Sequence, residues 1–389
     1  MSDPTKGPSR LNGTTPGCPP YGRPAVSLRT VKPSAAPAGV LSRSDIVFFV
    51  GALVMTVASG VTAHVDVGAV APFVVSAVAL AVLAAVVGRS VDHLSDRFGP
   101  GATGLLQSAL GNLPELFFGI FALRAGLVVV VQSALVGSIL ANVLLILGLA
   151  FLTGGLRHGT QRFAAESARS VALLLLLAVT ILCVPGITAH LQVAAAHHEA
   201  TLSTVASVVL LVVFVLSIPS AMSHNAPAVT EEIGGTAWPL SLVLGALIGS
   251  SVAAALVSDW FVTALTPALS ALHMSEAFAG LVVVAIAGNA VENVVGVQLA
   301  AKNKPDYALA VILRSPIVIA FALLPLLVLV SPVLGGARLT LVLPPELLVV
   351  LIISAVITAV VVFDGESTWL EGSCLIGLYA VIAAAFWWG

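Results

Sequence analysis

Two glutamates, Glu115 and Glu292, stand in matching motifs inside otherwise apolar runs of this sequence. Residues 111–115 read Gly-Asn-Leu-Pro-Glu, and residues 288–292, 177 positions later, read Gly-Asn-Ala-Val-Glu. An ionisable residue within a membrane segment costs about 2.5–3.5 kcal/mol on insertion scales and by default marks a functional site. A single buried glutamate could be a tolerated packing residue between helices. Two copies with the same local chemistry favour a duplicated site.

The residue types of the motif suit a hard cation. Asparagine and glutamate three positions apart lie on one face of a helix, so Asn112 accompanies Glu115 and Asn289 accompanies Glu292. Glycine permits departures from helical geometry and close helix approach, and proline removes one N–H. We therefore expect helix breaks at three motif residues, namely Gly111, Pro114 and Gly288.

Two carboxylates with amide and backbone oxygens match calcium, which takes six to eight oxygen ligands. Copper and zinc are disfavoured because no nitrogen or sulfur cluster accompanies the carboxylates, whereas sodium and manganese remain open. Burial and mutual repulsion favour the protonated glutamates when the site is empty, and a bound divalent cation favours the ionised forms. Cation and protons then compete for one site, as an exchanger requires. Apart from the transported ion, we expect no cofactor.

The composition is that of a membrane protein. Of 389 residues, 59% are hydrophobic and 9% are charged, with a mean hydropathy of +1.10; soluble domains carry roughly 25% charged residues. Long continuous apolar segments favour helices over a barrel. The net charge of −2 gives no indication of nucleic-acid binding. The expected partners are membrane lipid and the transported ions, and the oligomeric state is left open.

Eleven apolar segments are long enough to cross a hydrocarbon core of about 30 Å. They run roughly over 45–64, 68–88, 102–123, 127–153, 168–187, 200–219, 237–258, 277–300, 307–332, 346–363 and 372–388. The fold class expected is an all-α polytopic membrane protein. Residues 1–44, rich in Pro, Gly, Ser and Thr and without an apolar core segment, are predicted to be a disordered cytoplasmic tail.

Lysine and arginine predict the orientation, because they favour the cytoplasmic side. If the protein lies in the cell membrane with its N-terminus in the cytoplasm, thirteen of these residues lie inside, six from the tail and seven from loops. Only two lie outside. In that order they are Lys6, Arg10, Arg23, Arg29, Lys32, Arg43; Arg89, Arg97, Arg157, Arg162, Arg169, Lys302, Lys304; Arg124, Arg338.

The two motifs then fall in the third and eighth segments, which run in opposite directions. This predicts two five-helix inverted repeats, 67–219 and 237–389, joined by a cytoplasmic linker at 220–236. An extra N-terminal helix at 45–66 is left over. Ser138 lies 27 residues after Gly111, and Ser315 lies 27 after Gly288, which extends the repeat. Inverted repeats in transporters hold the substrate at their interface.

Three stretches resemble the cation/proton exchanger family of the calcium/cation antiporter superfamily. They are Gly-Asn-Leu-Pro-Glu-Leu through to Ser-Ile-Leu-Ala-Asn (111–142), Gly-Asn-Ala-Val-Glu-Asn through to Arg-Ser-Pro (288–316), and Gly-Glu-Ser-Thr-Trp-Leu-Glu-Gly (365–372). The resemblance implies Ca²⁺/H⁺ antiport rather than an enzyme activity. It also implies that Glu115 and Glu292 bind cation and protons, supported by Asn112, Asn289, Gln132, Ser138 and Ser315.

The sequence departs from the family in several places. Arg314 replaces a small residue beside Ser315, and Val318 stands where glutamine is frequent, so both bear on selectivity. An antiporter of Na⁺, K⁺ or Mn²⁺ against protons is the alternative. A cation channel is a further hypothesis, because acidic residues also line filters. An intramembrane enzyme is disfavoured by the lack of a His-Glu-x-x-His or comparable constellation.

Overall fold

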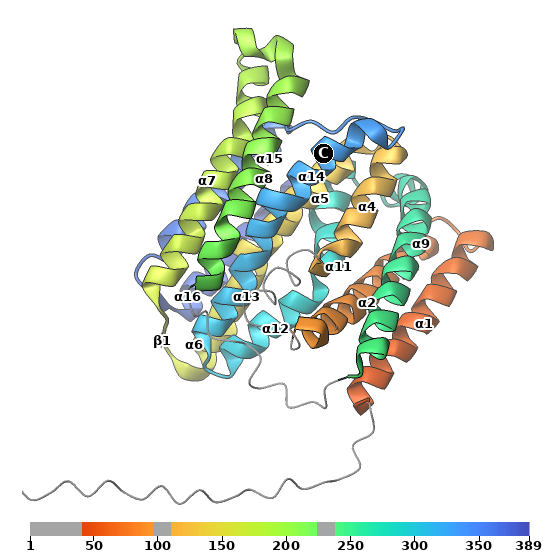
Figure 1. Ribbon diagram of the computed structural model, residues 1–389, viewed down its shortest axis with the longest axis horizontal. Coiled ribbons are helices and arrows are strands. Elements are labelled where there is room, and N and C mark those ends of the chain that lie inside the picture. The colour runs from red at the N-terminus through yellow and green to blue at the C-terminus, as the bar shows by residue number, and fades with distance from the viewer. Residues whose placement is uncertain (1–40, 96–109, 224–237, 389) are drawn as a thin grey trace, which may run out of the picture. The chain divides into compact units, whose positions relative to one another are not determined.

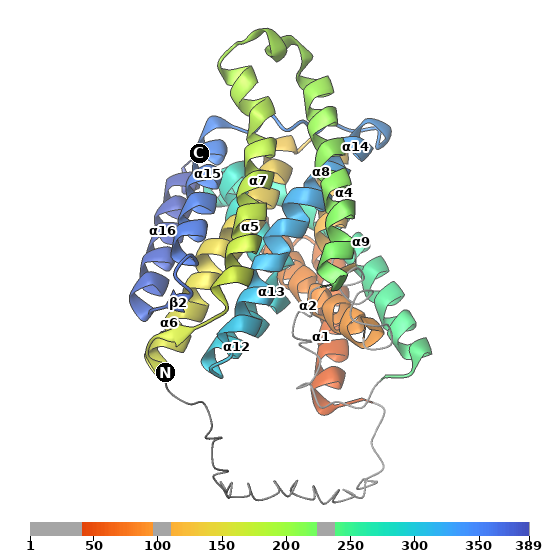
Figure 2. The same cartoon turned by 60° about the vertical axis from the view of Figure 1, so that its left-hand side comes forward.

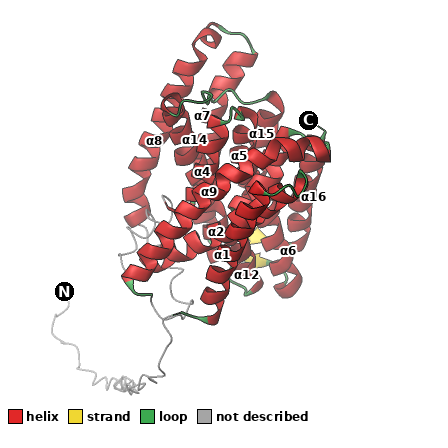
Figure 3. Cartoon of the chain, turned by 90° about the vertical axis from the view of Figure 1, so that its right-hand side faces the viewer, coloured by secondary structure: helices red, strands yellow, loops and turns green. Residues whose placement is uncertain are grey.

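The computed structural model describes residues 41–95, 110–223 and 238–388, and their fold is almost entirely helical (Figure 3). Residues 1–40 of the predicted tail and most of the predicted linker lie outside the described residues. So do the side chains of 290–293, which include Glu292. The tail was predicted to run to residue 44, but Ser42 already caps a helix that starts at Arg43.

Helices α1 (Arg43–His64), α2 (Val70–Ser95) and α9 (Leu240–Leu272) pack against one another (Figure 1). Asp45 at the start of α1 pairs with Arg89 of α2 at 2.8 Å and accepts a hydrogen bond from the Trp238 indole at 3.3 Å. The indole stacks on His93 of α2 with 4.3 Å between ring centroids. These contacts fix the first described residue after the linker against the two N-terminal helices.

The first motif opens α4 (Leu113–Arg124), which is followed by a long helical stretch from Val128 to His158. This stretch comprises α5 (Val128–Leu140), a π-helical segment η1 (Ala141–Ile146) and α6 (Leu147–His158). Every residue of α5 from Val130 to Leu140 is buried. Because α5 is buried on all sides, its sequence is mostly apolar around the whole helix.

The second motif lies in an equally segmented region. Its elements are α10 (Glu276–Phe278), the π-helical η4 (Ala279–Val284), α11 (Ala285–Gly288) and α12 (Ala290–Ala301). They are followed by α13 (Pro305–Val318), the π-helical η5 (Ile319–Leu323), α14 (Leu324–Val330) and the short 3₁₀ turn η6 (Ser331–Val333). Shifted by 177 positions, η1 falls on 318–323, which is within one residue of η5.

Four further helices complete the bundle: α7 (Ala165–His190), α8 (Glu199–Ser223), α15 (Pro345–Val361) and α16 (Trp369–Trp387). A 3₁₀ turn, η2 (Ala194–His198), joins α7 to α8, and this hairpin projects past its neighbours (Figures 1 and 2). Strands β1 (Gln161–Arg162) and β2 (Glu366–Ser367) pair antiparallel. The pairing ties the loop before α7 to the loop before α16.

Eight helical stretches of the described residues are long and apolar enough to cross a membrane. They are Arg43–His64, Val70–Val91, Val128–His158, Ala165–His190, Ala196–Ser217, Leu240–Leu272, Pro305–Val333 and Trp369–Trp387. Glu276–Gly288 and Pro345–Val361 are shorter apolar helical stretches. The structure thus supports a polytopic helical membrane protein, while the count of eleven crossings stays a prediction.

Two of the expected segments differ in detail from the structure. The segment expected over 277–300 is interrupted at Asn289 instead of forming one helix. Helix α9 starts near the expected place but continues to Leu272, well beyond 258. Its 33 residues span about 50 Å at 1.5 Å per residue, so a helix of this length must tilt or extend beyond the hydrocarbon.

Candidate functional site

The first motif starts a helix at a buried place. Asn112 precedes α4 with φ −97° and ψ 19°, outside helical geometry. Pro114 occupies the first turn, where the missing N–H costs little because the amides there have no partner within the helix. Glu115 lies in the same turn and is only 7% exposed. A carboxylate at a helix N-terminus is favoured by the partial positive charge of the unpaired amides.

The second motif repeats this backbone. Helix α11 ends at Gly288, and Asn289, with φ −95° and ψ 16°, separates it from α12. The two asparagines therefore adopt the same conformation to within about three degrees. Glu292 belongs to α12, and its side chain is outside the described part of the chain.

Glu115 of the first motif lies directly against Gly288 of the second. A Cβ atom built on Gly288 would lie 2.7 Å from Glu115 Oε1 and 3.1 Å from its Cδ. Because any side chain at position 288 would occupy the place of the carboxylate, glycine is what lets the two motifs meet. Two segments 177 positions apart thus converge on one buried carboxylate.

Asn289 is a hydrogen-bonding centre beside this carboxylate. Its Oδ1 accepts from Asn142 Nδ2 at 3.2 Å and from the Ser315 hydroxyl at 3.1 Å. Its Nδ2 donates to the Ala285 carbonyl at 3.0 Å. Asn142 Nδ2 also donates to the Ser138 carbonyl at 2.9 Å. The network joins α5, η1, α11 and α13 at the second motif.

Close backbone packing brings these elements together. A Cβ on Gly137 of α5 would clash with the backbone of Leu281 in η4, and one on Gly280 would lie 2.5 Å from the Val130 carbonyl oxygen. Two glycines on facing segments let α5 and η4 cross almost in backbone contact. This crossing holds Asn142 and Asn289 at hydrogen-bonding distance.

The supporting residues expected from the sequence lie in different surroundings. Asn112, Asn289, Ser138 and Ser315 are all buried, and the last three belong to the network just described. Gln132 is also buried, but its Nε2 donates to the carbonyls of Thr340 and Val342, each at 3.0 Å. In this conformation Gln132 therefore fastens the segment before α15.

Asn142 was not expected as a site residue. It is fully buried, and its Oδ1 has no hydrogen-bond partner among the described residues. Leaving such an oxygen unpaired costs about 1–3 kcal/mol. The available signal was an asparagine in the middle of an apolar helix, one turn after Ser138. Taken alone, that signal equally fits a hydrogen bond between helices.

The side-chain atoms described at the two motifs that could bind a cation are oxygens: the buried Glu115 carboxylate, Asn142 Oδ1 and the Ser315 hydroxyl. Within the described ranges no group of three or more His, Cys, Asp or Glu side chains forms a metal centre. The arrangement suits a hard cation that is bound transiently, because it combines few fixed charges with neutral oxygens.

Comparison with known proteins agrees with this fold. The chain matches the sodium/calcium exchanger protein family over residues 68–220 and 242–388. These two segments cover well over half of the chain, each containing one motif, and the chain belongs to this family of membrane transporters.

Two relatives carry a more specific name. A "Ca(2+)/H(+) antiporter" of Aphanothece halophytica is 32% identical over 335 residues, covering 81% of this chain and 89% of the relative. "Ca(2+)/H(+) antiporter ChaA" of Bacillus subtilis (strain 168) is 32% identical over 321 residues, covering 81% and 91%.

A solved structure has a similar fold. The crystal structure of the selenium-substituted Ca²⁺/H⁺ antiporter YfkE superposes with a TM-score of 0.75 at 28% identity. The match covers 88% of this chain and 99% of that one.

Proposed function

We propose that this protein exchanges Ca²⁺ for protons across the membrane by alternating access. The observation that carries the proposal is the contact between the Glu115 carboxylate and Gly288, because it brings both motifs to one buried site. Family membership and the names of the relatives support Ca²⁺ as the cation and protons as the counter-ion.

In the proposed mechanism Glu115 and Glu292 bind cation and protons in turn. With Ca²⁺ bound, both carboxylates are ionised; after its release, burial without a counter-ion favours their protonation. The two titrate as a coupled pair, so the proton pair belongs to the site and not to either residue. This coupling prevents the site from crossing the membrane empty and doubly charged.

We further propose that Asn142 Oδ1 contributes to the cation site. It is buried, lacks a hydrogen-bond partner among the described residues, and belongs to a side chain bonded to Asn289. Asn289 Oδ1 already accepts two hydrogen bonds here, so it would have to release one donor before binding a cation. In this conformation Asn289 therefore positions the neighbouring groups.

We propose that the two halves are inverted repeats of five helices preceded by α1, with the N-terminus in the cytoplasm of the cell. Three observations support this: the equal backbone angles at Asn112 and Asn289, the π-helical segments at matching positions, and the two family matches. The excess of Lys and Arg on one side supports the orientation.

Transport by purified protein in liposomes tests the function. When Ca²⁺ is added outside the liposomes, protons should leave their interior in exchange for the entering Ca²⁺. The variants Glu115→Gln and Glu292→Gln should not catalyse this exchange. A panel of Ca²⁺, Na⁺, K⁺ and Mn²⁺ identifies the cation. The family description also names sodium. If Na⁺ releases protons and Ca²⁺ does not, Na⁺ is the exchanged cation. Cation flux without proton movement would indicate a channel.

A further inference from the structure

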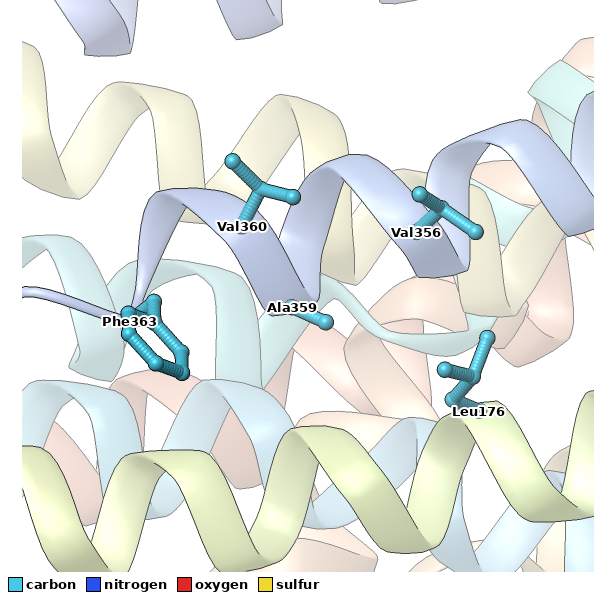
Figure 4. A pocket seen from close by; sticks show the side chains of 5 residues that line it. All are labelled: Leu176, Val356, Ala359, Val360 and Phe363. Carbon is cyan, nitrogen blue, oxygen red and sulfur yellow. The ribbon is translucent and has the colours of Figure 1, made fainter.

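A cavity of about 370 Å³ lies between α7 and α15, away from both motifs (Figure 4). Its lining is entirely apolar: Leu176 comes from α7, and the other residues are Val356, Ala359, Val360 and Phe363. Val360 is 68% exposed and Phe363 is 61% exposed, so the cavity opens on the outside of the bundle. In a membrane, this surface faces lipid.

A positively charged side chain, Arg169, lies at one end of the cavity. The Arg169 guanidinium lies over the Phe363 ring, 4.1 Å from its centroid, and Arg169 Nε donates to the Phe363 carbonyl at 2.6 Å. Phe363 therefore both lines the cavity and positions the Arg169 guanidinium. Arg169 precedes Leu176 by seven residues, or about 10 Å along α7, so the cavity extends from the charge along the helices.

The guanidinium has donors left for an anion. Nε makes the bond to Phe363, and the two Nη groups keep four N–H donors in a planar fork that fits phosphate. Within the described part of the chain, no carboxylate lies within 4.0 Å of Arg169, since the ion pairs found there are Arg89–Asp45 and Arg162–Glu366.

Acidic side chains near Arg169 have other contacts. Glu366 pairs with Arg162 at 3.0 Å, and Asp364 Oδ1 accepts from the Glu366 amide at 3.0 Å. Glu166, one turn before Arg169, is exposed on the first turn of α7. Glu366 and Asp364 thus form no ion pair with Arg169, so the two Nη groups of Arg169 keep their donors for an anion.

We propose that this cavity binds one acyl chain of a phospholipid whose anionic headgroup is held by Arg169. An apolar groove with a cation at one end complements a molecule that joins an apolar chain to a phosphate. Its volume lies in the range of small-molecule sites. Basic pockets between membrane helices on the cytoplasmic side bind anionic headgroups. The apolar lining disfavours free phosphate as the natural occupant, because phosphate would find only one polar side chain, Arg169, and would leave the cavity unfilled.

Native mass spectrometry of the full-length protein in detergent tests this site without relying on transport. Phosphatidylglycerol and phosphatidylcholine with identical acyl chains are titrated separately. Wild-type protein should retain one phosphatidylglycerol about fivefold more tightly than phosphatidylcholine, which corresponds to the ~1 kcal/mol that one arginine contributes near an anionic surface.

Two variants separate the headgroup from the chain. Arg169→Gln should remove the preference for phosphatidylglycerol, and Ala359→Phe, which fills the cavity, should reduce retention of both lipids. Matched controls are Arg157→Gln, which removes an exposed arginine at the end of α6, and Val349→Phe, which enlarges an exposed α15 residue outside the cavity. Both controls should bind lipid as wild type does, and Ala359→Leu serves if the phenylalanine variant fails to fold.

Four outcomes overturn the proposal. A preference for phosphatidylglycerol that persists in Arg169→Gln, or that disappears equally in Arg157→Gln, removes Arg169 as the headgroup ligand. Unchanged retention by a folded Ala359 variant removes the cavity as the chain site. Displacement of phosphatidylglycerol by millimolar inorganic phosphate shows a phosphate site rather than a lipid site.

Discussion

The two motif regions share a backbone and the motif asparagine and glutamate, but few of the polar side chains that follow. Asn112 and Asn289 have the same φ and ψ, and the π-helical segments η1 and η5 follow at corresponding positions. Shifting by 177 positions, however, places Leu309 opposite Gln132 and Ile319 opposite Asn142. After the motifs themselves, the serine pair, Ser138 and Ser315, is kept.

The helix crossings differ in the same way. Gly137 lets α5 approach η4 to backbone contact, whereas the corresponding residue of α13 is Arg314, which is exposed. A long cationic side chain cannot occupy a crossing as close as that of Gly137. The first half therefore supplies a close, amide-rich contact to the second motif, and the second half does not return an identical one.

This difference separates two roles, one for the residues that are duplicated in both halves and one for those found in the first half alone. In the proposed mechanism the duplicated backbone presents one carboxylate from each half, while the unduplicated Asn142, which donates to Asn289 Oδ1, organises one side of the site. Variants at equivalent positions of the two halves can therefore distinguish what is symmetric from what is not.

The largest effect is expected where the halves are equivalent. Glu115→Gln and Glu292→Gln should each reduce Ca²⁺-driven proton flux by about 100-fold or more, because removal of one buried charge partner costs roughly 3–5 kcal/mol. Flux in liposomes reports the loss, and reconstituted protein content is the control. If only one variant loses transport, the proton and cation chemistry belongs to one half.

Equivalent glycines should respond unequally. In Gly288→Ala the new Cβ must displace the Glu115 carboxylate, whereas no atom of the described residues lies within 4 Å of a Cβ on Gly111. We expect Gly288→Ala to raise the KM for Ca²⁺ about tenfold, the equivalent of about 1.4 kcal/mol. Thermal unfolding should barely change, because a flexible side chain can move aside.

Gly111→Ala is the matched control for that experiment. It should leave the KM for Ca²⁺ within about twofold of wild type, since it lies at the same motif position and its new Cβ would meet no atom of the described residues. Equal defects in the two alanine variants would mean that both glycines serve the backbone alone. The contact between the motifs would then have no part in cation binding.

A smaller asymmetry is expected between Asn142 and Ser315, which both donate to Asn289 Oδ1. Asn142→Leu removes a buried oxygen as well as the donor and should raise the KM for Ca²⁺ about fivefold, or about 1 kcal/mol. Ser315→Ala removes one hydroxyl and should change it by less than about twofold. Calcium titrations of proton release measure both, and a larger defect in Ser315→Ala would contradict the role given to Asn142.

Sequence alone could predict the helical membrane fold and the duplicated motif, because hydropathy and local repetition are written along the chain. It could also predict interrupted helices at the motifs, since glycine and proline are local signals. The interruption itself falls at Asn112 and Asn289, each directly after a glycine. Pro114 instead occupies the first turn of α4, where proline is well tolerated.

The contacts between residues far apart in the chain could not be predicted from the sequence. Nothing in the order of residues indicates that the Glu115 carboxylate rests on Gly288, or that Gln132 donates to the carbonyls of Thr340 and Val342. Such partners are backbone atoms, which every residue carries, so they leave no compositional trace. The role proposed for Asn142 was hidden for a related reason, because one asparagine in an apolar helix fits several structures.

The last prediction concerns net charge movement: we expect the membrane potential to have no effect on the exchange. If each half contributes one proton-binding glutamate, two protons exchange for one Ca²⁺ and the cycle moves no net charge. Uncoupled export of Ca²⁺ against 100 mV would cost roughly 4.6 kcal/mol, at about 2.3 kcal/mol per charge. Two returning protons cancel this cost and leave the pH gradient as the driving force.

Each pH unit then supplies about 2.7 kcal/mol for two protons, enough for a calcium gradient of roughly 100-fold. In liposomes, the reversal point of Ca²⁺ flux should follow the pH difference and stay fixed when valinomycin imposes a potassium potential. A reversal point that shifts with the potential would mean that the charges do not balance. The two carboxylates would then not be the whole of the exchange site, and a third charged group, or a different number of protons, would have to complete it.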